Sequence, residues 1–347
     1  MNRNQVICDL SAIGSWLMAM TNENQSLNHP FSEEITQRFR YAIEHEGYKN
    51  GWFEPKNVKQ ALQGISLWLN EATLSGFCAP YLFGEFNQTL GLILAGNIPL
   101  VGFHDMLCGL LSGFKLQVKL SSDDNRLLPF ILEALIELNP EYASIITLNP
   151  PKLYGFDAVI GTGSDSTLLH FKTYFKEIPH LLRGNRTSIA VLTGKESPEE
   201  LNNLGKDIFD FYGRGCRNVT HLLVPESYVF DAFHQAILPF STVIQSKKYG
   251  NNYDYNRAIH LLSQQPLLDN GFVLLMESTN LHPPLAMVNY HYYQTEEDII
   301  AYLAENKNQI QCVIGTNYLP FGTAQQPGIN EFADGINTMA WLEDACN

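Results

Sequence analysis

The sequence predicts an α/β protein built on doubly wound parallel sheets. Short apolar runs, which are typical of buried strands, alternate in its first half with segments of helical spacing. Each run is followed by a loop of small or polar residues. The clearest runs are Leu90–Leu94, Phe114–Leu120 and Phe156–Ile160. Alternation of strand and helix is the pattern of a parallel sheet that is covered by helices.

Helices are expected before and between these strands. Phe31, Ile35, Phe39 and Ile43 recur four residues apart, which is near helical spacing. Apolar residues from Asn57 to Leu69 recur at a similar, helical spacing. The segments between the strands predict helices over Val101–Leu111 and Leu127–Leu138, and another that starts near Ser166.

A second unit of the same kind is expected from residue 187 onward. We predict strands at Thr187–Leu192, His221–Val224, Phe272–Met276 and Ile310–Gly315. We predict helices at Pro198–Tyr212 and Tyr228–Leu238. The polar stretch Gln245–Asn256 is interpreted as a surface loop.

Composition excludes several classes of function. The formal net charge is −14 and no basic run is obvious, so a nucleic acid is a poor partner. No segment combines the length and apolarity of a membrane span, and no secretory leader is recognisable, so a cytoplasmic protein is expected. The six cysteines are far apart and form no Cys-x-x-Cys pair, which disfavours a zinc site or a disulfide framework. They are Cys8, Cys78, Cys108, Cys216, Cys312 and Cys346.

Cys216 is the candidate nucleophile. Gly213 and Gly215 leave the backbone free to follow a tight path past a ligand. The neighbouring cations Arg214 and Arg217 favour the thiolate, which is the reactive form of cysteine. The alternative from the local pattern alone is that Cys216 is a small buried hydrophobic residue.

Six stretches, taken in order, resemble the acyl-CoA reductases of the aldehyde dehydrogenase superfamily, which are typified by the fatty-acid reductase of bacterial bioluminescence. The resemblance extends from about Leu90 to Gly328. The stretches are Gly96–Leu100, Val118–Ser122, Gly161–Ser164, Gly213–Arg217, Glu277, and Pro320–Gly322 with Pro327–Gly328. It implies two three-layer α/β/α lobes, a Rossmann-like cofactor domain and a catalytic cysteine domain. We place the first, with the helical N-terminus, at residues 1–186 and 314–347, and the second at 187–313.

The resemblance also implies a reaction. Cys216 would attack an acyl-CoA or another acyl thioester, and hydride from a nicotinamide would release an aldehyde from the cysteinyl thioester. The Asn97 amide would stabilise the oxyanion. Without the resemblance, Asn97 is more simply a loop amide that bonds its own backbone ahead of Pro99. The implied partner is the thioester substrate, and a homo-oligomer is left open.

Further residues are implied to hold the cofactor: Lys119, Ser122, Gly161, Gly163, Ser164, Glu277 and Phe321. Ser122 stands where the family pattern has a glutamate that binds the ribose 2′-hydroxyl, so NADP is expected, with NAD as the alternative. From the residues alone, Lys119 could belong to a solvated strand face, the Gly161–Ser164 stretch could be a turn with a helix cap, and Glu277 could be a loop cap.

The chain also departs from the family pattern. The segment His180–Arg186 has no carboxylate where hydrolytic aldehyde dehydrogenases carry the base that activates water. The missing base fits a thioester reductase, but it also fits a protein with impaired chemistry. Two alternatives therefore stay open: a non-catalytic scaffold or binding protein with this fold, and an enzyme that oxidises aldehydes.

Overall fold

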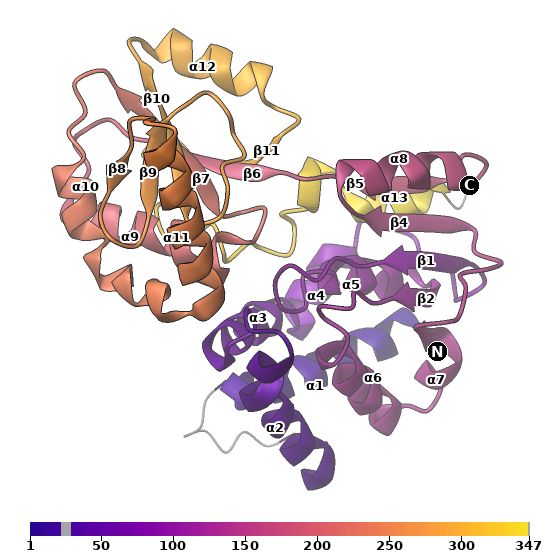
Figure 1. Ribbon diagram of the computed structural model, residues 1–347. Coiled ribbons are helices and arrows are strands. Elements are labelled where there is room, and N and C mark those ends of the chain that lie inside the picture. The colour runs from indigo at the N-terminus through magenta and orange to yellow at the C-terminus, as the bar shows by residue number, and fades with distance from the viewer. Residues whose placement is uncertain (22–28, 346–347) are drawn as a thin grey trace. The chain divides into compact units, whose positions relative to one another are not determined.

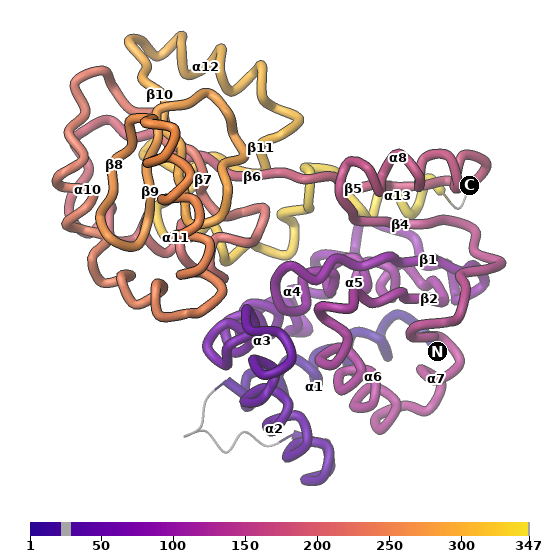
Figure 2. Tube along the Cα trace, in the orientation of Figure 1, coloured from indigo at the N-terminus to yellow at the C-terminus, as the bar shows by residue number. Residues whose placement is uncertain are grey.

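A computed structural model describes residues 1–21 and 29–345 of the chain (Figure 1). The chain forms two compact units, Met1–Gly184 with the segment from Gly328 onward, and Asn185–Pro327. Figure 2 follows the chain from β5 of the first unit into β6 of the second. The return to the first unit comes at residue 328 and not at the expected residue 314, because residues 322 and 324 hydrogen-bond to Asp207 of the second unit.

The first unit is organised around a five-stranded, wholly parallel sheet in the order β3-β2-β1-β4-β5. The strands are β1 (Thr89–Ile93), β2 (Lys115–Lys119), β3 (Ile146–Leu148), β4 (Ala158–Thr162) and β5 (His180–Arg183). Side chains alternate along β2: Leu116 and Val118 are buried, whereas Lys115 and Lys119 are exposed. This alternation gives the sheet one closely packed face and one more open face.

Helices close the packed face of this sheet. In α5 (Phe103–Ser112), Gly109 packs so closely against Leu90 and Leu116 that an added Cβ would lie within about 3 Å of both side chains. Further helices build outward from α5 and include α1 (Arg3–Thr21), α6 (Leu127–Leu138), α7 (Tyr142–Ile145) and α13 (Thr338–Ala345). On the open face, α8 (Asp165–Tyr174) packs against β4 and β5.

The expected N-terminal helices are present as α2 (Glu33–Lys49) and α3 (Pro55–Trp68), followed by α4 (Glu71–Cys78). Ser32 caps α2 by accepting a hydrogen bond from the Ile35 N–H, and Phe39 and Ile43 are buried as their spacing predicts. The helix α3 packs against α1, and α2 packs against α6, so these helices extend one hydrophobic core with the packed face of the sheet.

The second unit contains a six-stranded sheet in the order β11-β6-β7-β10-β9-β8, and β8 alone of these strands is antiparallel to its neighbour. The strands are β6 (Thr187–Val191), β7 (Val219–Pro225), β8 (Leu268–Asp269), β9 (Leu274–Glu277), β10 (Met287–Tyr293) and β11 (Ile310–Ile314). The helices are α9 (Pro198–Phe209), α10 (Asp231–Ala236), α11 (Lys247–Leu262) and α12 (Glu296–Glu305). The 3-10 turns are η1 (Asp210–Gly213) and η2 (Leu238–Gln245), with η3 (Ala333–Gly335) in the first unit.

The interpretation of Gln245–Asn256 as a surface loop is wrong, because most of this stretch lies in helix α11. Its apolar contacts come from tyrosines and not from aliphatic residues, which hides the helical spacing. Tyr249 and Tyr253 are buried one turn apart, and the Tyr249 hydroxyl donates to the Phe272 carbonyl at 3.0 Å. Tyrosine bodies therefore supply the buried stripe that aliphatic residues form in most helices.

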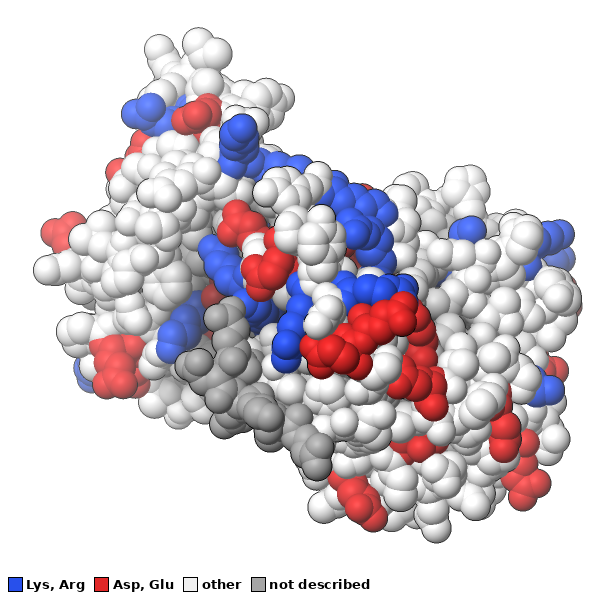
Figure 3. Space-filling view, turned by 90° about the horizontal axis from the view of Figure 1, so that it is seen from below, with Lys and Arg blue, Asp and Glu red and all other residues white. Residues whose placement is uncertain are grey.

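Opposite charges are interspersed on the surface. On the face in Figure 3, Lys and Arg side chains lie beside Asp and Glu side chains. Ion pairs that involve α2 include Arg38 with Glu133 and Lys59 with Glu44. None of the helices within residues 1–21 and 29–345 has the length and apolarity needed to cross a membrane.

Candidate active site

The predicted cofactor residues of the first unit gather at one edge of its sheet. Ile93 of β1 pairs with Lys119 of β2 on one side and with Gly161 of β4 on the other. The loops that carry Asn97, Ser122 and Ser164 therefore leave the sheet at the same, carboxyl edge. The strand order reverses between β1 and β4, and ligands of open parallel sheets bind at this kind of switch point.

Asn97 lies half-buried in the loop between β1 and α5. Gly96 packs against the loop after β2 so closely that an added Cβ would lie 2.5 Å from the Ser121 hydroxyl oxygen, so this position requires glycine. Further along, the Leu100 N–H donates to Asp124 at 2.6 Å, and Leu100 itself has a left-handed φ of 54°. The loop that carries Asn97 is thus fixed at both ends by the Ser121–Asp124 turn.

Gly161, Gly163 and Ser164 form the junction between β4 and α8. A Cβ on Gly163 would lie 2.9 Å from the Thr167 methyl group, so the turn is tight. Ser164 is the N-cap of α8 and accepts a hydrogen bond from the Thr167 N–H. The cap that was the alternative for this stretch is therefore present, at a helix N-terminus where backbone N–H groups favour an anion.

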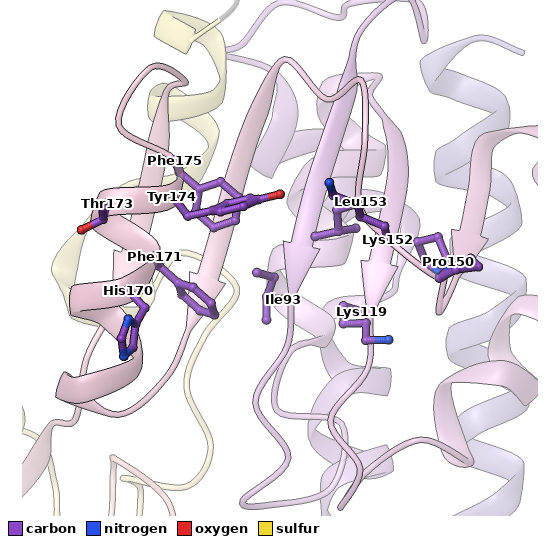
Figure 4. A pocket seen from close by; sticks show the side chains of 11 residues that line it. Ile93, Lys119, Pro150, Lys152, Leu153, His170, Phe171, Thr173, Tyr174 and Phe175 are labelled. Atoms are coloured by element: carbon purple, nitrogen blue, oxygen red, sulfur yellow. The ribbon is translucent and has the colours of Figure 1, made fainter.

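A cavity of about 760 Å³ opens on the face of the sheet that α8 partly covers (Figure 4). Its floor includes Ile93 and Lys119, at the ends of two adjacent strands. One wall is α8, through residues such as Phe171 and Tyr174. The opposite wall is the connection between β3 and β4, which includes Lys152 and contains no helix. Because that crossover lacks a helix, the sheet face stays open here.

Lys119 and Lys152 give this cavity a positive character. No Asp or Glu is among the residues that line it. Gln117 holds the crossover in place, because its side chain donates to the Tyr154 carbonyl at 2.7 Å and accepts from the Tyr154 N–H at 3.1 Å. Ser122 is not part of the lining: it is exposed in the turn that follows β2.

Cys216 lies in the second unit, half-buried, on the loop between η1 and the amino end of β7. The buried side chain of Asn218 organises this loop by accepting from the Gly215 N–H at 2.7 Å and donating to the Asp210 carbonyl at 2.9 Å. The Ser188 hydroxyl donates to the Cys216 carbonyl at 3.1 Å. The backbone on both sides of the thiol is thereby held in one path. Cys346 lies outside the described residues.

The approach to Cys216 is conformationally strained. Phe211, Tyr212 and Gly213 have consecutive left-handed φ values of 52°, 59° and 73°. Glycine tolerates this conformation, but for each of the two aromatic residues it costs roughly 1–3 kcal/mol of conformational free energy. Burial of both aromatic rings offsets the cost and keeps the turn closed.

The segment that carries Phe321 is tied to the same loop. Arg217 donates through Nε to the Ala324 carbonyl, so one of the two cations predicted to favour the thiolate is bonded to this segment. Asp207 of α9 accepts from the Gly322 N–H at 2.6 Å and from the Ala324 N–H at 2.9 Å. Phe321 directly precedes these hydrogen-bonded residues and is buried.

Glu277 is not brought to Cys216. It ends β9 and pairs with Tyr290, which in turn pairs with Leu222. Cys216 precedes the start of β7, whereas Glu277 lies at the carboxyl edge of the same sheet, so the two residues belong to opposite edges. The loop 278–286 returns to the Cys216 edge, where Leu285 and Gly213 line a cavity of about 90 Å³. The strand pattern around Glu277 gave no indication of this return.

The segment that lacks the expected base folds as β5 and the turn after it. Arg183 is buried there and donates to both Asp105 oxygens, at 2.9 and 3.3 Å. It also donates to the Thr338 hydroxyl at 2.8 Å, which attaches the returning C-terminal segment to the first unit. The guanidinium of Arg183 is thus occupied by structural contacts.

Three buried polar residues that organise the two loops escaped sequence reasoning: Asp124, Asp207 and Asn218. Asp124 and Asp207 accept from backbone N–H groups at least 24 residues away, whereas Asn218 bonds to backbone groups 3 to 11 residues away, and no motif marks any of the three. The polar stretch around Asp124 indicated only a loop. Burial raises the pKa of Asp124 to about 7 and that of Asp207 to about 6, although backbone N–H donors oppose the shift in both cases.

These two carboxyl groups contribute stability on mild acidification, and buried histidines oppose them. The pKa of Asp124 and that of Asp207 are higher in the folded than in the unfolded chain, so each group binds more protons in the folded state between about pH 4 and 7. Burial lowers the pKa of His221 to about 4 and also lowers those of His104 and His234, so these groups lose stability over the same range. We therefore expect the free energy of unfolding, measured with urea, to change between pH 8 and pH 5.5 by about 2 kcal/mol less favourably in Asp124→Asn than in the wild type. An equal pH dependence of the two proteins would contradict the prediction.

Comparison with known proteins agrees with this architecture. Aldehyde dehydrogenase 21 from Physcomitrella patens, solved with the product succinate, superposes with a TM-score of 0.68 at 9% identity over 99% of this chain and 84% of that chain. The Mycobacterium tuberculosis aldehyde dehydrogenase complexed with NAD+ gives 0.60 at 15% identity over 90% and 73% of the two chains. The NAD+ complex from Bacillus cereus gives 0.59 at 12% identity over 88% and 71%.

At these identities the likeness establishes the fold, which is that of the aldehyde dehydrogenases, as the sequence predicts. Residues 88–238 match the family model described as Acyl-CoA reductase (LuxC). The resemblance to the acyl-CoA reductases of the aldehyde dehydrogenase superfamily is therefore confirmed. No curated protein is similar enough in sequence to count as a match.

Proposed function

We propose that this protein reduces an acyl-CoA, or another acyl thioester, to an aldehyde with NADPH. The proposal is carried by Cys216, a half-buried thiol on a loop fixed by Asn218 and Ser188, in a chain with the aldehyde dehydrogenase fold. The match of residues 88–238 to an acyl-CoA reductase family supports it. In this scheme the first unit binds the dinucleotide and the second supplies the cysteine.

The reaction proceeds in two displacements. The Cys216 thiolate attacks the thioester carbonyl, and collapse of the tetrahedral intermediate expels the CoA thiolate and leaves an acyl-cysteine. Hydride from NADPH then adds to that acyl carbon, the C–S bond breaks, and aldehyde, NADP+ and the Cys216 thiolate result. The Asn97 amide and the Cys216 N–H are proposed to donate to the oxyanion in both steps.

The absence of a carboxylate in the segment 180–186 suits this chemistry. An acyl-cysteine is hydrolysed when a general base activates water beside it. The segment 180–186 supplies no carboxylate for this purpose, and its Arg183, a cation held by Asp105 and Thr338, cannot act as a base. The acyl-enzyme is therefore expected to persist until hydride arrives.

The cofactor is proposed to bind along the carboxyl edge of the first sheet. Its pyrophosphate would lie at the α8 N-terminus, beside Gly163 and Ser164. Its adenosine would occupy the cavity over Ile93 and Lys119, with the 2′-phosphate beside the ammonium groups of Lys119 and Lys152. Enzymes of this fold are known in complex with NAD+, which supports a nicotinamide cofactor at this edge.

We expect Lys152→Met to weaken NADPH selectively. Loss of one charged contact to a phosphate costs roughly 1.5–3 kcal/mol, so kcat/KM for NADPH should fall by about tenfold or more, while that for NADH stays unchanged. Lys176→Met, which removes an exposed lysine that pairs with Glu177, is the matched control. Equal kcat/KM values for NADPH and NADH in the wild type would contradict the preference for NADPH.

The decisive experiment is to trap the acyl-enzyme. The protein is incubated with an acyl-CoA that is radiolabelled in the acyl group, without NADPH, and is then denatured. We expect about one label per chain, released by hydroxylamine and, in an undenatured sample, by NADPH as labelled aldehyde. A protein that never acquires label would instead be a non-catalytic scaffold. Production of free acid from an aldehyde and NADP+ would favour aldehyde oxidation.

A further inference from the structure

We propose that Asp207 is a positioning residue that holds the Phe321 segment in register with the Cys216 loop and does so only when ionised. The inference rests on the proposed function, because it concerns the geometry around the same thiol. Asp207 carries no expected chemical role, and both of its side-chain oxygens bond to the segment that follows Phe321.

Both oxygens of Asp207 are used by one short segment. Oδ2 accepts from the Gly322 N–H at 2.6 Å and Oδ1 accepts from the Ala324 N–H at 2.9 Å. Gly322 has a left-handed φ of 85°, and a Cβ there would lie 3.0 Å from Asn203 of the same helix, α9. The segment thus lies directly on α9, and the carboxylate fixes its two N–H groups.

The same residue is linked through its backbone to the nucleophile loop. The Asn218 side chain donates to the Asp207 carbonyl at 3.0 Å and accepts from the Gly215 N–H at 2.7 Å. Arg217 adds a further bond to this hydrogen-bond circuit, because it donates to the Ala324 carbonyl. A continuous set of hydrogen bonds therefore runs from Gly215 and Arg217, on either side of Cys216, to the residues that follow Phe321.

Ionisation of Asp207 determines whether this circuit is complete. A carboxylate presents two acceptors, whereas a carboxylic acid turns one oxygen into a donor that faces a backbone N–H. Burial raises the pKa of Asp207 to about 6, and the nearby Asp210 raises it further while Lys206 and the two N–H donors lower it. The circuit should therefore weaken as the pH falls through 6.

Three variants test this inference. Asp207→Asn keeps the shape but presents one acceptor and one donor, Asp207→Ala removes both acceptors, and Glu199→Gln changes an exposed carboxylate on the same helix as a control. The first readout is amide hydrogen exchange of a peptide that contains Gly322 and Ala324. The second is the rate of Cys216 alkylation by iodoacetamide, and the third is reductase activity. The last two are followed from pH 5 to 8.

We expect Asp207→Asn to speed exchange of the 322–324 amides at least tenfold and to lower kcat by about tenfold at pH 7.5, with KM changed less than threefold. The wild type and Glu199→Gln should lose activity below about pH 6, whereas the activity of the Asp207 variants should not fall in this range. An Asp207 variant whose activity still falls below pH 6, or whose amides at 322–324 exchange at the wild-type rate, would overturn the inference. Exchange and alkylation need no acyl substrate, so they judge the role of Asp207 even if reductase activity is not found.

Discussion

Replacing Cys216 with alanine is expected to abolish aldehyde formation, by about 10⁴-fold or more, and to prevent acyl labelling completely. The reason is that the proposed pathway has no route from thioester to aldehyde that avoids the covalent step. The side chain lies on a loop whose shape comes from Asn218, Ser188 and the left-handed turn before it. Removing the thiol should therefore leave the backbone path, the thermal midpoint and cofactor binding unchanged.

The matched control is Cys8→Ala, which removes an exposed thiol from α1. It should retain full activity and full label. A second comparison is Cys312→Ala, because the Cys312 sulfur lies 3.0 Å from the Ser188 hydroxyl that binds the Cys216 carbonyl. We expect Cys312→Ala to acquire label at a reduced rate but to the same final extent. If Cys216→Ala forms aldehyde at the wild-type rate, the covalent scheme is wrong.

The fold was largely predictable because its signals are local. Buried strands such as Leu90–Leu94 and helices such as Leu127–Leu138 carry apolar residues at the period of the element, and the structure confirms both. Strand β3 was not predicted, because it is three residues long and carries no period. Helix α11 was missed since Tyr249 and Tyr253 supply its buried face. Local pattern thus fails where an element is short or where its buried residues are polar at one end.

The candidate site was predictable to the extent that its residues lie at strand ends. Lys119 and Gly161 meet at the carboxyl edge of one sheet, as the alternation of strands and helices implies. Glu277 was expected from the family resemblance, and the chain returns along loop 278–286 before it reaches the Cys216 edge. Asp207 and Asn218 bind backbone groups of other segments, and only the folded chain brings those groups together.

The buried carboxylate of Asp207 puts stability and activity in opposition. Protonation of Asp207 favours the folded state, because burial raises its pKa above the value in the unfolded chain. Yet it is the ionised form that presents two acceptors to the Gly322 and Ala324 N–H groups. Protonation of this group should therefore contribute to the stability of the folded chain while it slows turnover. Such a cost in stability is common where a site needs a charge held in one place.

Asn97→Ala is expected to lower kcat by about 10²–10³-fold, the usual loss when one oxyanion donor is removed. The loop should survive the change, because Gly96 packed against Ser121 and Leu100 bonded to Asp124 hold it on both sides of Asn97. Single-turnover measurements should show both acyl transfer and hydride transfer slowed, since each passes through an oxyanion. NADPH affinity, measured by fluorescence titration, should stay within twofold of the wild type.

Two further variants separate donation from packing at this position. Asn97→Asp keeps the shape but replaces the amide donor with an acceptor, so it should be at least as impaired as Asn97→Ala. Asn87→Ala removes an exposed amide just before the amino end of the same strand, β1, and should behave as the wild type. If Asn97→Asp were as active as the wild type, the side chain would be a loop amide that serves its own backbone. If Asn97 donates to the oxyanion, a side chain of the same shape that lacks the N–H donor should not restore activity. This requirement distinguishes stabilisation of an oxyanion from support of a turn.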